Sequence, residues 1–417
     1  MLKGYLQQFT NRLKMTSVYR ELINNYFVLA FALLLFAIFI NHWIAFPFVI
    51  IYYFYCYRQN KEVFFLVLLI LLVFIVHFLL IKVNYSFKEA DEVKGIIVGI
   101  EHKEKYNKLI VRDCYYKKIV YDYDFHPLKP GEKVYAKGIS LKASGQRVEN
   151  GFNYREYLHH QKIDQVLLSE EIVVIGNQFH LARISFALNQ YLSHFPEKTQ
   201  AFMKAIIIGD DSQFTEEFIN GMQTNGISHL FAVSGLHIGL LVIIIKKILD
   251  FFNLSNRTIT SITIVFLALY LIVTGFSASI LRACLLYFGS LINKKGKFGL
   301  KSIDIISIVF ILLLLFNPYY IYNLSFILSF LMAFIIILVS PLLKKYQNQW
   351  QILIISAIAV VITFPIIINF NYQINLLSPF LNVIYIAVFS SIILPFTLLV
   401  FVLPFLSGIY QYLLVAF

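Results

Sequence analysis

Long apolar runs alternate with short polar connections along most of the chain, and one long polar region interrupts them. The apolar runs approach the length at which a helix crosses a hydrocarbon core of about 30 Å. The predicted spans are 26–40, 43–57, 63–81, 227–245, 258–273, 277–292, 303–316, 321–343, 352–369 and 376 to the end. This pattern predicts a polytopic α-helical membrane protein, in which the first two short spans form a hairpin.

The polar region, residues 83–177, shows a different periodicity. Short alternating runs are separated by turn signals, as expected for strands. The runs are "VKGIIVGI", "KLIVRD", "KKIVYDYDF", "EKVYAKGISL" and "DQVLLSEEIVVIG". Strands of this number and length suit a small β-barrel such as an OB-fold. Periodicity leaves a β-sandwich fragment open as the alternative.

The stretch between the polar region and the second group of spans, residues 178–225, alternates apolar and polar residues on a helical period. Such helices lie at a membrane surface with their apolar face in the lipid. The expected organisation is therefore a basic N-terminus (1–25), N-terminal membrane helices (26–82), a β domain (83–177), interfacial helices (178–225) and a membrane domain (226–417).

Composition agrees with this reading and adds an orientation. The chain is 59% hydrophobic and 14% charged, whereas soluble proteins carry about a quarter charged residues. The formal net charge of +12 is concentrated in the N-terminus and in alternate connections, which is the positive-inside pattern. We therefore expect a cytosolic N-terminus and an extracytoplasmic β domain. No cysteine or histidine spacing indicates a metal site, and we expect no cofactor.

Polar residues inside apolar spans are the candidate functional residues, because an ionisable side chain there costs roughly 2.5–3.5 kcal/mol on insertion scales. In "GISHLFAVSGLHIGLL", Ser234 and His237 are three residues apart, on one face of the expected helix, and His229 lies near its outer end. Gly235 and Gly239 form a GxxxG step, which allows close helix packing.

Three further segments carry polar residues in apolar surroundings. The residues are Gly275, Ser279 and Arg282 in "TGFSASILRACLLYFG", Ser325 and Ser329 in "NLSFILSF", and Asn382 after the Pro-broken span. Small and hydroxyl residues at this spacing are common packing devices, and that reading stays open. Arg282 has no acid nearby in sequence, which favours a position along an aqueous path.

In the β domain, "RDCYYKKIVYDYDF" interleaves aromatic residues with lysines. Tyr115, Tyr116, Lys117 and Lys118 are candidates for stacking bases and holding phosphates. The alternative is a half-buried strand with a solvated lysine pair, since aromatic residues favour strands in any case.

Taken together, these segments resemble the signature blocks of the ComEC competence family, in the family's order. The blocks are "GISHLFAVSGLHIGLL", "TGFSASILRACLLY", "NLSFILSF" and "ITFPIIINFNYQINLLSPFLNVI", and "GFNYREYLHHQKI" resembles the end of the family's extracellular OB-like domain. The resemblance implies a channel that passes single-stranded DNA across the bacterial cytoplasmic membrane in natural transformation. The family's marked positions fall on His229, Ser234, Gly235, His237, Arg282, Ser329 and Asn382.

The resemblance also implies partners and one departure. Many family members continue into a metallo-β-lactamase-like domain, but this sequence has no HxHxDH-type motif, so it resembles a short variant or a fragment, or a form served by a separate nuclease. No GxxxxGKS or GxxxxGKT loop supplies energy. A surface DNA receptor, a cytosolic helicase-like ATPase and a second copy of the chain are the partners that the family suggests.

Two other functions remain as alternatives. "GFSAS" with His237 as base would suit an intramembrane serine hydrolase, which needs hydrogen-bond reach between the two side chains. A transporter of another anionic polymer or lipid would share the spans but differ in cargo. On balance the sequence predicts a channel with no catalytic residues.

Overall fold

The computed structural model describes residues 25–41, 45–103, 105–113, 115–146, 153–231, 233–371 and 375–416. Contacts divide the chain into two compact units. The first comprises Met1–Lys82 with Leu285–Lys345, and the second comprises Val83–Cys284 with Tyr346–Phe417. Each unit therefore combines segments that are far apart in the sequence.

Within the described residues, five helices are long and apolar enough to cross a membrane. They are α5 (Lys61–Asn84), α11 (Asn256–Val273), α14 (Leu324–Leu343), α15 (Asn348–Asn371) and the run from α16 (Ser378–Val388) through the π-helix η5 (Phe389–Ile393) to α17 (Leu394–Val402). Two shorter apolar helices are α3 (Tyr26–Asn41) and α13 (Ser302–Phe316). The protein is a polytopic α-helical membrane protein, as the hydrophobic pattern predicts.

In the first unit, side chains join helices through backbone carbonyls. Tyr52 and Tyr53 of α4 (Phe46–Gln59) donate their hydroxyls to the carbonyl oxygens of Val28 and Ala32 in α3, at 3.1 and 3.0 Å. These two bonds fix the α3–α4 pair that the sequence predicts as a hairpin. The Asn60 side chain then caps α5, accepting from the backbone N–H of Glu62 at 2.8 Å.

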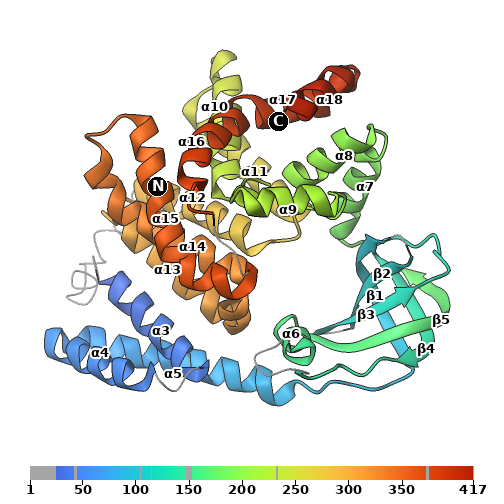
Figure 1. Ribbon diagram of the computed structural model, residues 1–417. Coiled ribbons are helices and arrows are strands. Elements are labelled where there is room, and N and C mark those ends of the chain that lie inside the picture. The colour runs from blue at the N-terminus through green and yellow to red at the C-terminus, as the bar shows by residue number, and fades with distance from the viewer. Residues whose placement is uncertain are drawn as a thin grey trace, which may run out of the picture. The chain divides into compact units, whose positions relative to one another are not determined.

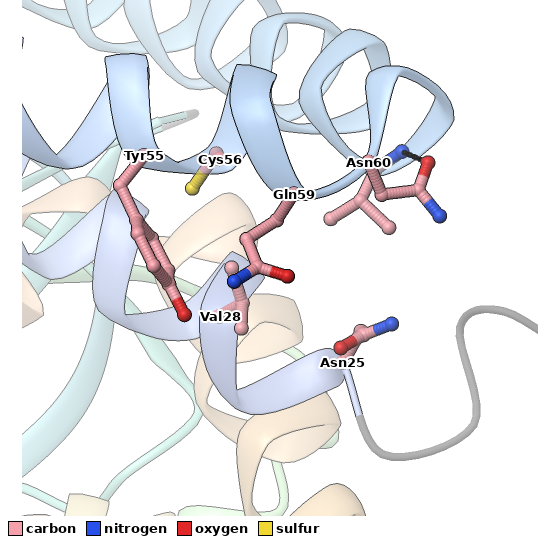
Figure 2. Close-up of a pocket in the computed structure, with 7 residues that line it drawn as sticks. Asn25, Val28, Tyr55, Cys56, Gln59 and Asn60 are labelled. Carbon is pink, nitrogen blue, oxygen red and sulfur yellow. Dashed lines mark hydrogen bonds between the residues drawn. The ribbon is translucent and has the colours of Figure 1, made fainter.

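One pocket of about 180 Å³ lies at the start of this hairpin, and Figure 2 shows its lining. It is lined by Asn25, Val28, Tyr55, Cys56, Gln59, Asn60 and Val63. None of the predicted functional residues is among them.

The β domain is a closed five-stranded barrel of OB-like topology (Figure 1). Its strands are β1 (Glu92–His102), β2 (Asn107–Asp113), β3 (Tyr116–Asp122), β4 (Glu132–Ser140) and β5 (Ile163–Asn177), in the order β1-β2-β3-β5-β4. The β3–β5 pair is parallel and the other pairs are antiparallel. The helix α6 (Tyr154–His160) lies between β4 and β5 in the chain and packs Leu158 against β3 and β5.

The barrel confirms the strands and the barrel class that alternation predicts. Inward residues of successive strands, among them Val93, Leu109, Val120 and Val134, form one buried core. Alternate residues point outward because successive side chains of a strand face opposite sides.

The segment after the barrel differs in part from the expected surface helices. Its helices are α7 (Ala182–Leu192), α8 (Glu197–Met203), the π-helix η2 (Lys204–Ile208) and α9 (Glu216–Thr224). Most of α8 and η2 is buried in a core shared with α17 and α18 (Ser407–Ala416). This part therefore packs inside protein on most sides, which the amphipathic pattern did not indicate.

The remaining helices of the membrane domain are α10 (Gly235–Phe251) and α12 (Ala278–Gly296), with short 3₁₀ turns η3 (Ser228–Leu230), η4 (Pro318–Tyr322) and η6 (Pro404–Leu406) between longer elements. The predicted span 227–245 is not one helix. The part before Gly235 contains the 3₁₀ turn η3, and regular α-helix begins only at Gly235.

Candidate functional site

The irregular stretch before α10 explains why serine and histidine occur in an apolar span. Ser234 is the N-cap of α10, and its hydroxyl accepts from the backbone N–H of Leu236 at 3.3 Å. The backbone N–H of Ser234 donates in turn to Nδ1 of His237 at 3.2 Å. The pair forms a capping box, which satisfies backbone donors at a helix start. The expectation that Ser234 lies on a helical face with His237 is wrong, because Ser234 precedes the helix.

The cap uses Nδ1 of His237 and does not involve the other ring nitrogen, Nε2. The side chain is 0% exposed, and its ring lies edge-on to Phe389 with centroids 5.1 Å apart. Since Nδ1 accepts a hydrogen bond, the proton of the neutral ring is on Nε2. Nε2 is buried, and no hydrogen bond of ordinary geometry reaches it among the described residues, although the ring also interacts with a backbone group of Leu230. His229, by contrast, lies in η3 with an exposed side chain.

The guanidinium of Arg282 lies against the start of α10. Arg282 is 8% exposed, in the half of α12 that also carries Ser279. A Cβ added at Gly235 would stand 3.0 Å from its Nη2 atom. Gly235 therefore allows this approach, which is a packing role as predicted but toward a cation and not toward another helix backbone.

The charge arrangement here is unusual. The N-terminus of a helix carries partial positive charge, so a cation beside it is unfavourable and an anion is favourable. Arg282 and the α10 N-terminus both present positive potential at the same place, in a part of the chain with apolar surroundings. Membrane transporters use interrupted helices in this way to hold anionic groups of their substrates.

The start of α16 packs on the connection between α9 and η3. The side-chain amide of Asn375 donates to the carbonyl oxygen of Thr224 at 2.7 Å. Gly226 has φ +70°, and a Cβ there would be 2.7 Å from Cβ of Ser378. Asn382, one turn along α16, is 7% exposed, and its Oδ1 atom is buried without a partner among the described residues.

These contacts bring together most of the candidate residues of the second unit. Ser234, Gly235, His237 and Arg282 meet at the α10 start, while Asn382 belongs to the α16 segment that packs on residues 224–226. Sequence reasoning missed Asn375 and Gly226. A glycine and an asparagine beside predicted span ends are the only signals they gave, and such residues are frequent in ordinary turns.

Gly239 and Gly275, two of the three glycines predicted to allow close helix packing, do not lie against a neighbouring helix. A Cβ at Gly239 would meet nothing within 4 Å, so no neighbouring helix approaches it closely. Gly275 has φ +62° and follows the end of α11, where its N–H and that of Phe276 bond back to Ile272 and Leu271 at 3.2 and 2.9 Å. This is a Schellman motif, which ends a helix and needs a left-handed residue. The predicted packing role is wrong for both.

Ser325 and Ser329 belong to α14 in the other unit. Asn323 caps that helix, accepting from the N–H of Phe326 at 2.9 Å. Ser325 is exposed, and Ser329 is half-buried. Whether they line a path with Arg282 stays a prediction.

In the barrel, the two lysines predicted to contact phosphates, Lys117 and Lys118, face opposite sides of β3. Lys118 points inward, is 6% exposed and lies 3.4 Å from a carboxylate oxygen of Asp113. A phosphate-contacting role for Lys118 is therefore not supported. Lys117 points outward, opposite Arg112 on β2, and burial followed by the charges of Arg112 and Lys162 lowers its pKa.

The two tyrosines also differ. Tyr115 is 53% exposed, and the ammonium of Lys162 lies 5.0 Å from its ring centroid. Tyr116 is half-buried against Tyr85, with ring centroids 5.9 Å apart. The outward-facing group on this end of the barrel is thus the exposed Arg112 and Tyr115 with the half-buried Lys117 and Lys162. Two of these, Arg112 and Lys162, were missed because only the pairing of β2, β3 and β5 brings them beside Lys117.

In the described ranges, no three histidine, cysteine, aspartate or glutamate side chains come together in a way that could hold a metal ion.

Comparison with known proteins places the chain in a family. It is 27% identical over 274 residues to ComE operon protein 3 of Bacillus subtilis, which covers 64% of this chain and 35% of that protein. It is 25% identical over 216 residues to an uncharacterized protein of Mycoplasma pneumoniae, covering 50% of this chain and 55% of the relative. The chain thus spans about a third to a half of the length of the curated relatives it matches.

The family described as competence protein matches residues 206–417, about half of the chain. The chain that carries the capped α10 turn and Arg282 therefore belongs to the competence protein family.

Proposed function

We propose that this chain forms a path by which single-stranded DNA crosses the bacterial cytoplasmic membrane during natural transformation. Membership of the competence family supports a role in DNA uptake. The single observation that carries the finer proposal is the largely buried guanidinium of Arg282 beside the capped N-terminus of α10.

The physical reason is the charge of the cargo. A phosphate passing the α10 start meets a guanidinium and the partial positive charge of a helix N-terminus, both of which attract anions. Conduction requires that each such contact be weak enough to release the strand. One buried arginine with a few neutral donors meets that requirement better than a dense basic lining. The buried Nε2 of His237 and Oδ1 of Asn382 add polar atoms that water or the strand can satisfy.

In this proposal the N-terminus is cytosolic and the barrel is extracytoplasmic. The barrel's group of Arg112, Tyr115, Lys117 and Lys162 then receives DNA from a surface receptor. A cytosolic helicase-like ATPase draws the strand inward, a nuclease removes the other strand, and a second copy of the chain is a further partner.

The test is uptake of labelled single-stranded DNA in a transformable host that lacks its own channel. The host is complemented with the wild type, with Arg282→Ala, or with Arg282→Lys, which retains the charge. We expect Arg282→Ala to lower uptake at least about tenfold, because a hydrogen bond to a charged group contributes roughly 1.5–3 kcal/mol. Arg282→Lys retains part of the activity.

The matched control is Arg257→Ala, which removes an exposed arginine at the start of α11. Equal amounts of each variant in the membrane are confirmed first. Equal uptake by the wild type and Arg282→Ala would contradict the proposal. Labelling of the wild type by a fluorophosphonate, with no DNA uptake, would favour a serine hydrolase. Uptake of another labelled polyanion in place of DNA would favour a different cargo.

A further inference from the structure

A second feature of the barrel lies at the opposite end of the β2–β3 face from Arg112 and Lys117. It consists of five tyrosines, named here the tyrosine platform: Tyr106, Tyr121, Tyr123, Tyr154 and Tyr157. They come from three places in the chain, namely the β1–β2 turn, β3 with the residue after it, and α6. Nothing in the site described above uses them.

The platform is a connected set of rings. Tyr106 lies edge-on to Tyr121 with centroids 5.1 Å apart and tilted against Tyr123 at 5.4 Å. Tyr121 shares a side-chain hydrogen bond with Tyr154, and Tyr154 stacks on Tyr157 at 6.3 Å. Tyr123 is 49% and Tyr157 45% exposed. A fold that needed these rings only as core would bury them, whereas here the outer two keep about half of their surface open.

The register of β2 and β3 places the platform in line with the basic group. Lys108 faces Tyr121 at one end, Ile110 faces Ile119 in the middle, and Arg112 faces Lys117 at the other end. These residues point away from the barrel core, which Leu109, Val111 and Val120 fill. In the middle of the face, Leu158 of α6 covers Ile119, so the uncovered side is that of β2. The two ends are four residues apart along β2, which is roughly 13 Å. An extended strand of a few nucleotides that follows β2 can therefore reach both.

The location agrees with how this type of barrel binds. OB-folds hold oligonucleotides and oligosaccharides on the β2–β3 face, between the β1–β2 and β4–β5 connections. Tyr106 is in the first connection, and Tyr154 and Tyr157 are on the helix in the second. The neighbouring cations favour a nucleic acid over a neutral sugar, because they offer charge that only a polyanion needs.

We infer that the tyrosine platform stacks the bases of a single strand while Arg112 and Lys117 hold its phosphates. This inference rests on the proposed function and deepens it, since it makes the barrel selective for single-stranded over duplex DNA. In a duplex the bases are paired and stacked on one another, so only the phosphates remain for the protein. Base–aromatic stacking tolerates any sequence, as an uptake system requires.

The experiment measures binding to the full chain in lipid nanodiscs. The probes are an oligothymidine of about 12 nucleotides, within the usual range for one OB-fold, an abasic oligomer of the same length and charge, and a duplex of the same length. We expect the wild type to bind oligothymidine at least about tenfold more tightly than the abasic oligomer, because stacking contributes roughly 1–3 kcal/mol per base. Equal affinities for the two would overturn the inference.

The variants are Tyr106→Ala with Tyr123→Ala, and the same pair changed to Phe. The Ala pair loses about tenfold or more in affinity for oligothymidine and little for the abasic oligomer. The Phe pair keeps both affinities, because stacking needs the ring and not the hydroxyl. Tyr135→Ala is the matched control, since Tyr135 lies on β4 opposite Lys94 and Val173, away from the β2–β3 pairing.

Other outcomes separate the possible failures. Equal losses for oligothymidine and the abasic oligomer would mean that the rings act only through the fold, and would overturn the inference. If the Ala pair does not fold, Tyr157→Ala repeats the test at an exposed position on α6. Displacement of oligothymidine by a chitin oligomer would make the platform a sugar site instead. Loss of uptake in Arg282→Ala, with no preference for oligothymidine in the wild type, would leave the proposed function standing and reject the platform.

Discussion

Asp122 in the barrel and His237 in the membrane domain are both completely buried polar side chains, yet their surroundings differ. Asp122 accepts from the backbone N–H groups of Asp124 and His126 at 3.2 and 2.9 Å and lies 2.8 Å from Nδ1 of His126. The side-chain amide of Asn107 adds a longer contact at 3.4 Å. His237 has its Nδ1 atom in the cap of α10, and no hydrogen bond of ordinary geometry reaches its Nε2 atom among the described residues.

The difference separates a structural role from a binding role. A buried polar group with all its hydrogen bonds made fixes a local conformation, which for Asp122 is the connection from β3 to β4. A buried donor that makes no hydrogen bond destabilises the protein without its ligand, and a water molecule or a ligand that accepts from this donor removes that cost. We therefore expect substitutions at Asp122 to act on stability and those in the α10 turn to act on transport.

The largest effect is expected at Asp122. Asp122→Ala removes a carboxylate that organises two backbone N–H groups and a histidine, and should lower the free energy of unfolding of the barrel by about 3 kcal/mol. Native-state hydrogen exchange of the barrel amides measures this change. Asp124→Ala, at an exposed neighbour, is the matched control and should change the free energy by less than about 0.5 kcal/mol. A similar loss in both variants would remove the contrast between the two sites.

A smaller effect is expected at Gly226, in the turn between α9 and η3. Gly226→Ala combines a left-handed backbone with a Cβ only 2.7 Å from Cβ of Ser378, so we expect a cost of about 2 kcal/mol and a displaced turn. Uptake should fall even in protein that inserts normally.

Gly221→Ala in α9 is the control for this change. A Cβ there would meet nothing within 4 Å, and alanine favours the helix by about 0.5–1 kcal/mol. Thermal unfolding and uptake are measured for both variants. If Gly226→Ala were as active as Gly221→Ala, the position of the turn would not matter for transport.

The third prediction concerns pH and the barrel alone. Burial, followed by the charge of His159, lowers the pKa of His160 from 6.5 to about 4. The unfolded chain binds this proton near pH 6.5 and the folded barrel does not, so the barrel loses stability as the pH falls below about 6.5. Between pH 7 and pH 5 the loss should be roughly 1–2 kcal/mol, allowing for partial solvent screening.

His160→Gln should remove that part of the pH dependence. The measurement is the unfolding free energy of the wild type and of His160→Gln as a function of pH, and the difference between the two curves isolates this histidine from the other titrating groups. Parallel curves would mean that His160 is protonated equally in the folded and unfolded states.

The elements were predictable where composition or alternation decides them. Apolar runs such as Lys61–Asn84 have no stable alternative to a helix in lipid, because every backbone group must be satisfied internally. The barrel strands could be predicted because inward and outward residues alternate. The opposite orientations of Lys117 and Lys118 in β3 should also have been predictable. Adjacent residues of a strand face opposite sides, so Lys117 and Lys118 could not both point to solvent.

The site was less predictable, because tertiary contacts create it. The apolar run continues through residues 227–245 without a charge or proline, so hydropathy gave no sign that helix begins only at Gly235. The one local signal was Ser234 three residues before His237, which fits a capping box as well as a helical face. The meeting of Gly235 with Arg282, or of Arg112 with Lys117, depends on packing and strand register that no single segment encodes.

The most direct test of the central claim is a cross-link between a strand in transit and the α10 start. A photoreactive amino acid replaces Leu236, which is 38% exposed beside the cap, or Val265 on α11, which is 59% exposed. A single strand blocked at its trailing end is stalled during uptake and the sample is irradiated. We predict a DNA adduct at position 236 and none at position 265. Uptake that proceeds without an adduct at 236, or with equal adducts at both positions, would contradict a DNA path along the start of α10.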